Sequence, residues 1–108
     1  MAMINVEKNE FDAKVLKAEQ PVMVDFWAPW CGYCRRLNPL MDQIAQEFDG
    51  RMTVAKVNID DLGDVANEYH IEVIPTLMVF IGGELKGEVV NPASRADVLA
   101  WLKESGVE

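Results

Sequence analysis

Cysteine and histidine are scarce in this sequence of 108 residues, which contains two cysteines and one histidine. Two cysteines form one disulfide at most, which excludes a small fold held together by several disulfides. A structural zinc site takes about four ligands, and this chain offers only Cys31, Cys34 and His70 as sulfur and nitrogen ligands. One chain is therefore unsuited to zinc binding by itself, although two chains could share a metal through four cysteines.

Basic residues and long apolar runs are also few. Ten Lys and Arg stand against 18 Asp and Glu, a formal net charge of −8, so nucleic acid is not an expected partner. The longest apolar stretch, IPTLMVFIGG, is too short to span a bilayer, and the first ten residues lack the basic start and apolar run of an export signal. These absences predict a soluble, unexported, cytoplasmic protein that does not bind membranes.

Apolar residues make up half of the chain, and no linker or repeat divides it, so we predict a single domain over residues 1–108. Gly82-Gly83 lies between two apolar runs, which is typical of a two-residue hairpin, and Gly87 is expected to mark a bulge. The predicted strands lie near residues 4–6, 21–27, 52–60 and 71–81 and after Gly83. With the helices between them, these strands predict an α/β fold: a central mixed β-sheet flanked by helices on both faces.

Apolar residues spaced three and four apart predict the helices. The longest begins at about Cys34, contains Pro39, which should kink it, and ends at Asp49-Gly50. The other predicted helices are one capped by Asn9, a short one at 64–70, and one opened by the capping box Ser94-Arg-Ala-Asp97.

The two cysteines stand three residues apart in the motif Cys31-Gly-Tyr-Cys34, between a strand that ends at Trp27 and the long helix. Cys31 should lie at the helix N-terminus, where unpaired N–H groups and the helix dipole lower the pKa of a thiol. Residues at this spacing have Cα atoms about 5 to 6 Å apart, which fits a disulfide. Cys31 is the predicted nucleophile, and the deeper Cys34 is predicted to resolve a mixed disulfide. A structural disulfide is the alternative, but so short a loop constrains the unfolded chain little.

The chain resembles the thioredoxin family over nearly all of its length. The resemblance rests on VDFWAPWCGYC, on Pro39 in the next helix, on KVNID, on IPTLMVF and on the Gly-Gly turn. A CxxC motif alone is weak evidence, whereas its combination with an aspartate-bearing strand and a downstream Ile-Pro-Thr is specific. A lowered thiol pKa is itself a known property of thioredoxins. The lowered pKa predicted for Cys31 is therefore not independent support for the resemblance. The resemblance implies the thioredoxin fold and a thiol–disulfide oxidoreductase that reduces client proteins.

By this resemblance, Asp25 and Lys56 join the two cysteines as catalytic residues. Burial in an apolar strand should raise the pKa of Asp25, which would accept a proton from Cys34 through water, with Lys56 as its partner. A simple structural ion pair is the alternative. A cis bond at Ile74-Pro75 would present the Ile74 backbone to an extended client segment. The expected substrate-binding residues are Trp30, Gly32, Tyr33, Ile74, Pro75, Thr76 and Asn91.

Two positions depart from the usual pattern of the family. Tyr33 stands where thioredoxins usually have proline, and a tyrosine at this position is similar to the related glutaredoxins. Tyrosine, unlike proline, has a backbone N–H. We therefore predict a better stabilised Cys31 thiolate and a less reducing couple than in a CGPC counterpart. Asn91-Pro92 replaces a glycine and a small residue beside the substrate groove, and the added bulk should narrow the range of clients.

The resemblance implies no bound cofactor beyond the redox-active Cys31–Cys34 disulfide. It implies a monomer, reduced by an NADPH-dependent thioredoxin reductase, with clients such as peroxiredoxins, methionine sulfoxide reductases and ribonucleotide reductase. The alternatives are a disulfide oxidase or isomerase, a glutathione-coupled variant, and a binding subunit that does not use its thiols. Arg35 and Arg36 either steer acidic partners or form a solvated helix face. Solubility is the expected role of Asp60, Asp61, Asp64, Glu68 and Glu72.

Overall fold

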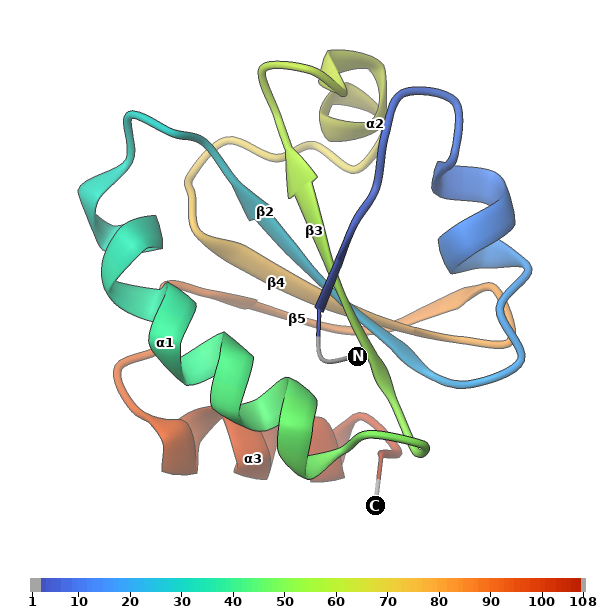
Figure 1. Ribbon diagram of the computed structural model, residues 1–108, viewed down its shortest axis with the longest axis vertical. Coiled ribbons are helices and arrows are strands. Elements are labelled where there is room, and N and C mark those ends of the chain that lie inside the picture. Colours follow the sequence, from blue (N-terminus) through green and yellow to red (C-terminus); the bar gives the residue numbers. More distant parts are fainter. Residues whose placement is uncertain (1–2, 108) are drawn as a thin grey trace.

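The computed structural model describes residues 3–107, and Figure 1 shows a twisted central sheet between helices. The strands are β1 (Met3–Asn5), β2 (Val22–Trp27), β3 (Thr53–Asn58), β4 (Thr76–Ile81) and β5 (Glu84–Val90). Their order across the sheet is β1-β3-β2-β4-β5. β3 is parallel to β1 and β2, whereas β4 is antiparallel to β2 and β5, so the predicted mixed sheet is confirmed.

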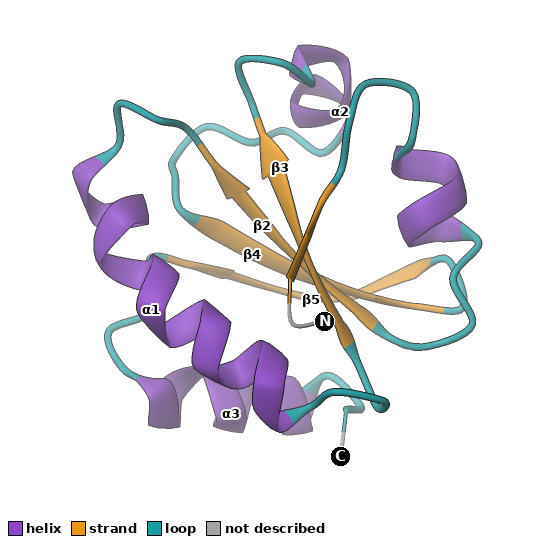
Figure 2. Cartoon of the chain, in the orientation of Figure 1, coloured by secondary structure: helices purple, strands orange, loops and turns teal. Residues whose placement is uncertain are grey.

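Helices cover both faces of this sheet, as the prediction required (Figure 2). The helices α1 (Gly32–Glu47) and α3 (Arg95–Glu104) pack on one face. The short π-helical turn η1 (Asp12–Leu16) and α2 (Gly63–Glu68) pack on the other. Within residues 3–107, no helix is long and apolar enough to cross a membrane.

The central strand β2 is buried on both faces, and its side chains alternate between the two helical layers. Val24 and Phe26 belong to the apolar cluster under η1 and α2, whereas Met23 belongs to the cluster under α1 and α3. Because side chains two apart on a strand share a face, Asp25 lies on the same side as Met23. The strand therefore directs the carboxyl group of Asp25 into the layer between the sheet and α1.

The long helix α1 begins and ends close to the predicted positions. It starts at Gly32, two residues before the predicted start, because Cys31 is its N-cap residue and its sulfur accepts a backbone N–H. Its last turn is followed by Gly50 with a φ of 84°, a left-handed conformation that glycine adopts readily. Pro39 lies inside the helix, and the kink expected there stays a prediction.

The prediction that Asn9 caps the first helix is wrong. Asn9 has a φ of 71°, whereas an N-cap residue is normally extended, and the residue before η1 is Phe11, which makes no side-chain cap bond. Phe11 and Val15 are buried in the cluster under this face of the sheet. Apolar contacts with the sheet, rather than a polar cap, therefore position this turn.

The hairpin between β4 and β5 forms at Gly82-Gly83, where both φ angles are positive, as the sequence predicted. The pairing register shifts between Val79 and Phe80, which leaves Lys86 as an extra residue beside Gly87, the predicted bulge position. The hairpin places the start of β4 and the end of β5 together, at the edge of the sheet where α1 begins (Figure 1).

Candidate active site

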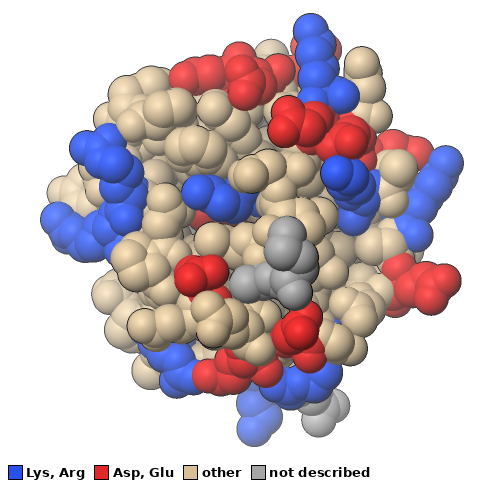
Figure 3. All heavy atoms as spheres, in the orientation of Figure 1, with Lys and Arg blue, Asp and Glu red and all other residues tan. Residues whose placement is uncertain are grey.

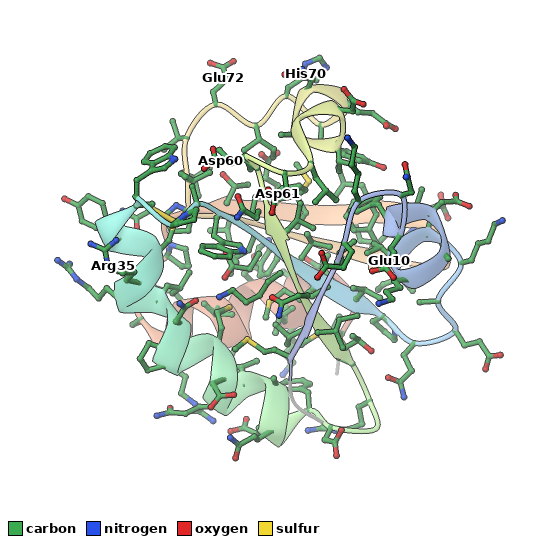
Figure 4. The ribbon with its side chains drawn as sticks, turned by 45° about the horizontal axis from the view of Figure 1, so that its top comes forward. Glu10, Arg35, Asp60, Asp61, His70 and Glu72 are labelled. Carbon is green, nitrogen blue, oxygen red and sulfur yellow. A yellow bond between two sulfur atoms is a disulfide. The ribbon has the colours of Figure 1, made fainter. Side chains whose placement is uncertain are left out.

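The two cysteines form a disulfide at the N-terminus of α1, drawn as a yellow bond in Figure 4. Their Cα atoms are 5.3 Å apart, within the range predicted from the spacing. Cys31 Sγ accepts a hydrogen bond from the Cys34 N–H, with 3.1 Å between the heavy atoms. After reduction, a thiolate at Cys31 would keep this donor and would lie at the positive end of the α1 dipole, and both stabilise negative charge.

The two cysteines differ in their access to a partner. Cys31 is 6% exposed, whereas Cys34 is completely buried. Cys31 Sγ also lies 3.9 Å from the carbonyl oxygen of Ile74, at the loop that precedes β4. This ordering agrees with the predicted roles, in which Cys31 attacks first and Cys34 resolves.

Asp25 is fully buried, and among residues 3–107 neither of its carboxylate oxygens has a hydrogen-bond partner. Loss of hydration raises the pKa of Asp25 from 3.8 to about 7, and the attraction of Lys56 opposes this shift only in part. An acid with a pKa near 7 exists in both protonation states at neutral pH, so it can both accept and return a proton. Trp27, two residues after Asp25 on β2, packs against the buried cluster that contains Cys34, so Asp25 and Cys34 both face the layer between the sheet and α1.

Lys56 is paired with Asp25 in the register of β2 and β3, but the Lys56 ammonium group lies over the ring of Trp27. Lys56 Nζ is 4.2 Å from the centroid of the half-buried Trp27 ring, a cation–π contact. The ion pairs recorded in the described part of the chain do not include Lys56. The alternative of a direct structural ion pair is thus not realised there, and Lys56 acts on Asp25 as a nearby charge.

The loop before β4 lies against the disulfide. Its Ile74–Pro75 bond is cis, as the resemblance implied. The hydroxyl of Thr76 donates to the carbonyl oxygen of Val73, and the N–H of Asn91 donates to the carbonyl oxygen of Pro75 at 2.8 Å. Asn91 has a φ of 45°, the left-handed conformation expected where the family usually has glycine. The structure therefore brings Asn91, which follows β5, next to the predicted residues at and before the start of β4.

Aromatic side chains form the exposed rim of the site. Trp30 and Tyr33 are 65% and 56% exposed, with Gly32 between them at the start of α1. Trp30 Nε1 donates to the carboxylate of Asp60 at 3.1 Å, a contact that sequence reasoning missed because it assigned Asp60 to solubility. A signal existed: Trp30 and Asp60 follow the ends of two neighbouring parallel strands, which lie at one edge of the sheet.

The sequence does not favour metal binding by a single chain. Among residues 3–107, no group of three or more His, Cys, Asp or Glu side chains is placed to hold a metal ion. His70 and Glu72 lie beyond α2, and Figure 4 shows both pointing outward, away from the start of α1. The two cysteine sulfurs are bonded to each other.

The disulfide at the start of α1, with one buried cysteine and one more exposed cysteine, places this protein in the class of thiol–disulfide oxidoreductases. The family model described as thioredoxin matches residues 2–104. The chain is 41% identical over 101 residues to the thioredoxin of Rickettsia felis, covering 94% of this chain and 96% of that one. It is 43% identical over 103 residues to thioredoxin 1 of Nostoc sp., covering 95% and 96%. The chain belongs to the thioredoxin family, whose members are protein-disulfide reductases.

A plant relative is longer. The chain is 42% identical over 104 residues to the chloroplastic thioredoxin M4 of Arabidopsis thaliana, covering 96% of this chain and 54% of that protein. The chain thus spans about half the length of this chloroplastic relative and nearly all of the two bacterial ones.

Proposed function

We propose that this protein reduces client disulfides by two successive thiol–disulfide exchanges. The Cys31 thiolate attacks one sulfur of the client disulfide, the client S–S bond breaks, and a mixed disulfide forms. Cys34 transfers its proton through water to Asp25 and attacks Cys31 Sγ, which re-forms the Cys31–Cys34 disulfide and releases the client as a dithiol. Two electrons pass to the client in each cycle, and its two thiolates take up one proton returned by Asp25 and one from solvent, which replaces the proton that Cys31 lost on ionising.

The observation that carries this proposal is the asymmetry of the two sulfurs at the start of α1. Cys31 is the more exposed of the two residues, and its sulfur already accepts a backbone N–H, whereas Cys34 is completely buried. Asp25 lies in the layer that Cys34 faces, and its pKa of about 7 suits a group that takes up and returns a proton near neutrality. Lys56 limits the rise of this pKa through its charge.

The client docks, in this proposal, along the loop before β4 and the aromatic rim. Backbone groups beside the disulfide, such as the Ile74 carbonyl oxygen 3.9 Å from Cys31 Sγ, suit an extended client segment. Main-chain recognition of this kind supports a range of client sequences. The residues assigned to binding are Trp30, Gly32, Tyr33, Ile74, Pro75, Thr76 and Asn91.

The cycle also needs an electron donor, and we assign that role to an NADPH-dependent thioredoxin reductase. Peroxiredoxins, methionine sulfoxide reductases and ribonucleotide reductase are the proposed clients. The likeness to bacterial thioredoxins over nearly their full length supports these assignments. The cytoplasm is the proposed location, because the cycle consumes a dithiol that a reducing compartment maintains. In this proposal the chain works as a monomer and a single domain, because one sheet and the helices that cover it position every residue given a role.

The test is insulin disulfide reduction with a thioredoxin reductase and NADPH, in which native protein is compared with Cys31→Ser. We expect fast turnover that the substitution abolishes. If the reductase does not reduce the native protein although its dithiol form attacks insulin, the assigned donor is wrong and glutathione is the next one to test. If the pre-reduced protein does not attack insulin, the proposed function is wrong, and a binding role independent of the thiols is favoured.

A further inference from the structure

A cavity of about 310 Å³ opens beside the disulfide, between the first turns of α1 and the segment that joins β5 to α3. Tyr33 and Leu40 line it from the helix, and Asn91 and Pro92 line it from the opposite side. Tyr33 and Asn91-Pro92 are also the two places where the sequence departs from the usual pattern of the family. The two departures therefore meet at one cavity next to the reactive sulfurs.

Among the residues that the structure describes, Arg36 is the one charged residue that lines this cavity. Its guanidinium carbon is 5.1 Å from the centroid of the Tyr33 ring, so the aromatic ring holds the charge at the rim. The ion pairs recorded for residues 3–107 do not include Arg36. The neighbouring Arg35 is engaged differently, because its Nη1 donates to the carbonyl oxygen of Pro29 at 2.8 Å. Arg36 thus offers a positive charge that no carboxylate in the described part of the chain neutralises through an ion pair.

The charge of Arg36 is opposite in sign to the formal net charge of the molecule, which is −8. Figure 3 shows basic side chains gathered at the edge where α1 begins, whereas acidic side chains gather over other parts of that face. On the other side of the disulfide, the carboxylate of Asp60 is bound to Trp30 Nε1, and Figure 4 shows Asp60 apart from Arg35 at the start of α1. A client that docks here meets a cation on one side of the reactive sulfurs and an anion on the other.

The cavity is also joined to the surface where the client docks. The N–H of Asn91 donates to the carbonyl oxygen of Pro75, so the cavity wall and the cis-proline loop are directly linked. Tyr33 lies between the two cysteines in the sequence and forms the nearer wall. A client cysteine bonded to Cys31 therefore brings its neighbouring residues close to Arg36.

We propose that this cavity binds an aspartate or glutamate that lies within a few residues of the reactive cysteine of a client protein, with Arg36 as the partner of the carboxylate. The inference rests on the proposed function and narrows its substrate class. Planar guanidinium groups suit carboxylates because they present two parallel N–H donors. Asp60 would disfavour an acidic residue on the opposite side of the client cysteine, so the preference should depend on direction.

The test measures reduction of synthetic peptides by pre-reduced protein in single turnover, without any reductase. Each peptide contains one disulfide, and a single Glu is moved through three positions on either side of the attacked cysteine, with Gln at the same position as the reference. For native protein we expect one position at which the Glu peptide reacts about threefold to fivefold faster than its Gln counterpart, as an exposed ion pair allows. The ratio should fall at high salt, because exposed charges are screened.

Three variants complete the test. Arg36→Gln should bring the Glu to Gln ratio to about one, and Arg36→Lys should retain part of the preference because it keeps the charge. Lys103→Gln removes the same charge at the far end of α3 and should leave the ratio as in native protein. Equal rates for Glu and Gln peptides in native protein, or a preference that survives Arg36→Gln, would overturn the inference while the proposed function stands.

Oxidised glutathione serves as a further probe, because it carries carboxylates but is not a protein. Dependence on Arg36 for glutathione alone, and not for any Glu peptide, would show that the cavity serves a small thiol and that the inferred client class is wrong. If pre-reduced protein reduces no peptide at all, the proposed function is contradicted, and the inference falls with it.

Discussion

The layer between the sheet and the pair α1 and α3 contains two regions that are built from the same elements and differ in composition. Around Met23, Ile44 and Leu102 the buried side chains are apolar and belong to one cluster. At the start of α1, the same strand and helix bury Asp25 without a hydrogen-bond partner in the described chain, while Trp30 is largely exposed. The first region follows the rules that stabilise folds, whereas the second departs from them.

This difference indicates how a small domain holds a reactive site. A buried carboxylate without partners costs free energy, and β2 keeps it in place because the residues before it are packed on both faces. The packed region therefore stabilises the fold, and the region beside the disulfide provides a proton acceptor whose pKa has moved to about 7. Substitutions in the two regions should consequently have opposite effects on stability.

The largest expected effect is in the packed region. Leu102 is 1% exposed in the cluster under α3, and Leu102→Ala should lower the free energy of unfolding by about 2 to 5 kcal/mol. Urea unfolding of the oxidised protein measures this change. Leu99→Ala is the matched control, because Leu99 lies on the same helix and is only half-buried, so it should cost clearly less. Equal losses for the two variants would contradict the assignment of the core.

Asp25→Asn should raise the free energy of unfolding, whereas Leu102→Ala lowers it, and the size of the increase should depend on pH. The Asp25 pKa is about 7 in the folded protein and near 3.8 when unfolded, so the folded state holds an extra proton between about pH 4 and pH 7. The native protein therefore loses stability as the pH rises through this window, by about 4 kcal/mol for three pKa units. Asn cannot ionise, so the free energy of unfolding of the variant should exceed that of the native protein most at pH 8 and least at pH 4.

Urea unfolding of both oxidised proteins at several pH values measures this difference. Asp61→Asn removes an exposed carboxylate and serves as the control, for which the pH dependence should match that of the native protein. Parallel pH profiles for the native protein and Asp25→Asn would show that Asp25 is not the group responsible. In single turnover, Asp25→Asn should also slow the release of the client from the mixed disulfide, because Cys34 loses its proton acceptor.

A smaller effect is expected at the exposed rim of the site. Tyr33→Pro removes the backbone N–H at this position, so the Cys31 thiolate should be less stabilised and the couple more reducing. A shift of the order of 30 mV, equivalent to about 1.4 kcal/mol, is the expected scale. Equilibration with a glutathione redox buffer measures the potential. Tyr33→Ala keeps the N–H and separates its effect from that of the ring; no shift in Tyr33→Pro, or a shift toward a more oxidising couple, would sink this explanation.

The smallest effect concerns the cap of α3, whose residues are given no role in the chemistry. Ser94 Oγ accepts the N–H of Asp97 at 3.2 Å, as the predicted capping box requires of its first residue. Ser94→Ala should cost about 1 kcal/mol of stability, and Ser94→Thr, which keeps the hydroxyl, should cost less. Thermal unfolding distinguishes the two variants, and identical losses would indicate that the hydroxyl is not what matters.

Local patterns predicted the parts of the fold that depend on one element at a time. The apolar run before Trp27 gave β2, the spacing of apolar residues gave α1 to within two residues, and Gly82-Gly83 gave the hairpin. The position of Cys31 at a helix N-terminus followed from the boundary between β2 and α1. The aspartate within an apolar strand was equally visible, because a charged residue there stands out from its neighbours.

Contacts between distant segments were not predictable in the same way. Asp60 and Trp30 are thirty residues apart, and the bond between them depends on the pairing of β2 with β3. Asn9 has the residue type of a cap, but contacts of Phe11 and Val15 with the sheet decide where η1 lies. The contact of Arg36 with Tyr33 depends on side-chain conformation, so the sequence left two interpretations of Arg36 open.

The most direct test of the central claim is to trap the mixed disulfide. Cys34→Ser protein, which keeps the accessible Cys31 but lacks the resolving thiol, is incubated with a disulfide-containing client and examined by mass spectrometry. We predict a stable adduct of one client molecule joined to Cys31 and no such adduct with Cys31→Ser. An adduct that forms on Cys34 in the Cys31→Ser protein, and not on Cys31 in the Cys34→Ser protein, would contradict the account, because it would reverse the roles assigned to the two sulfurs.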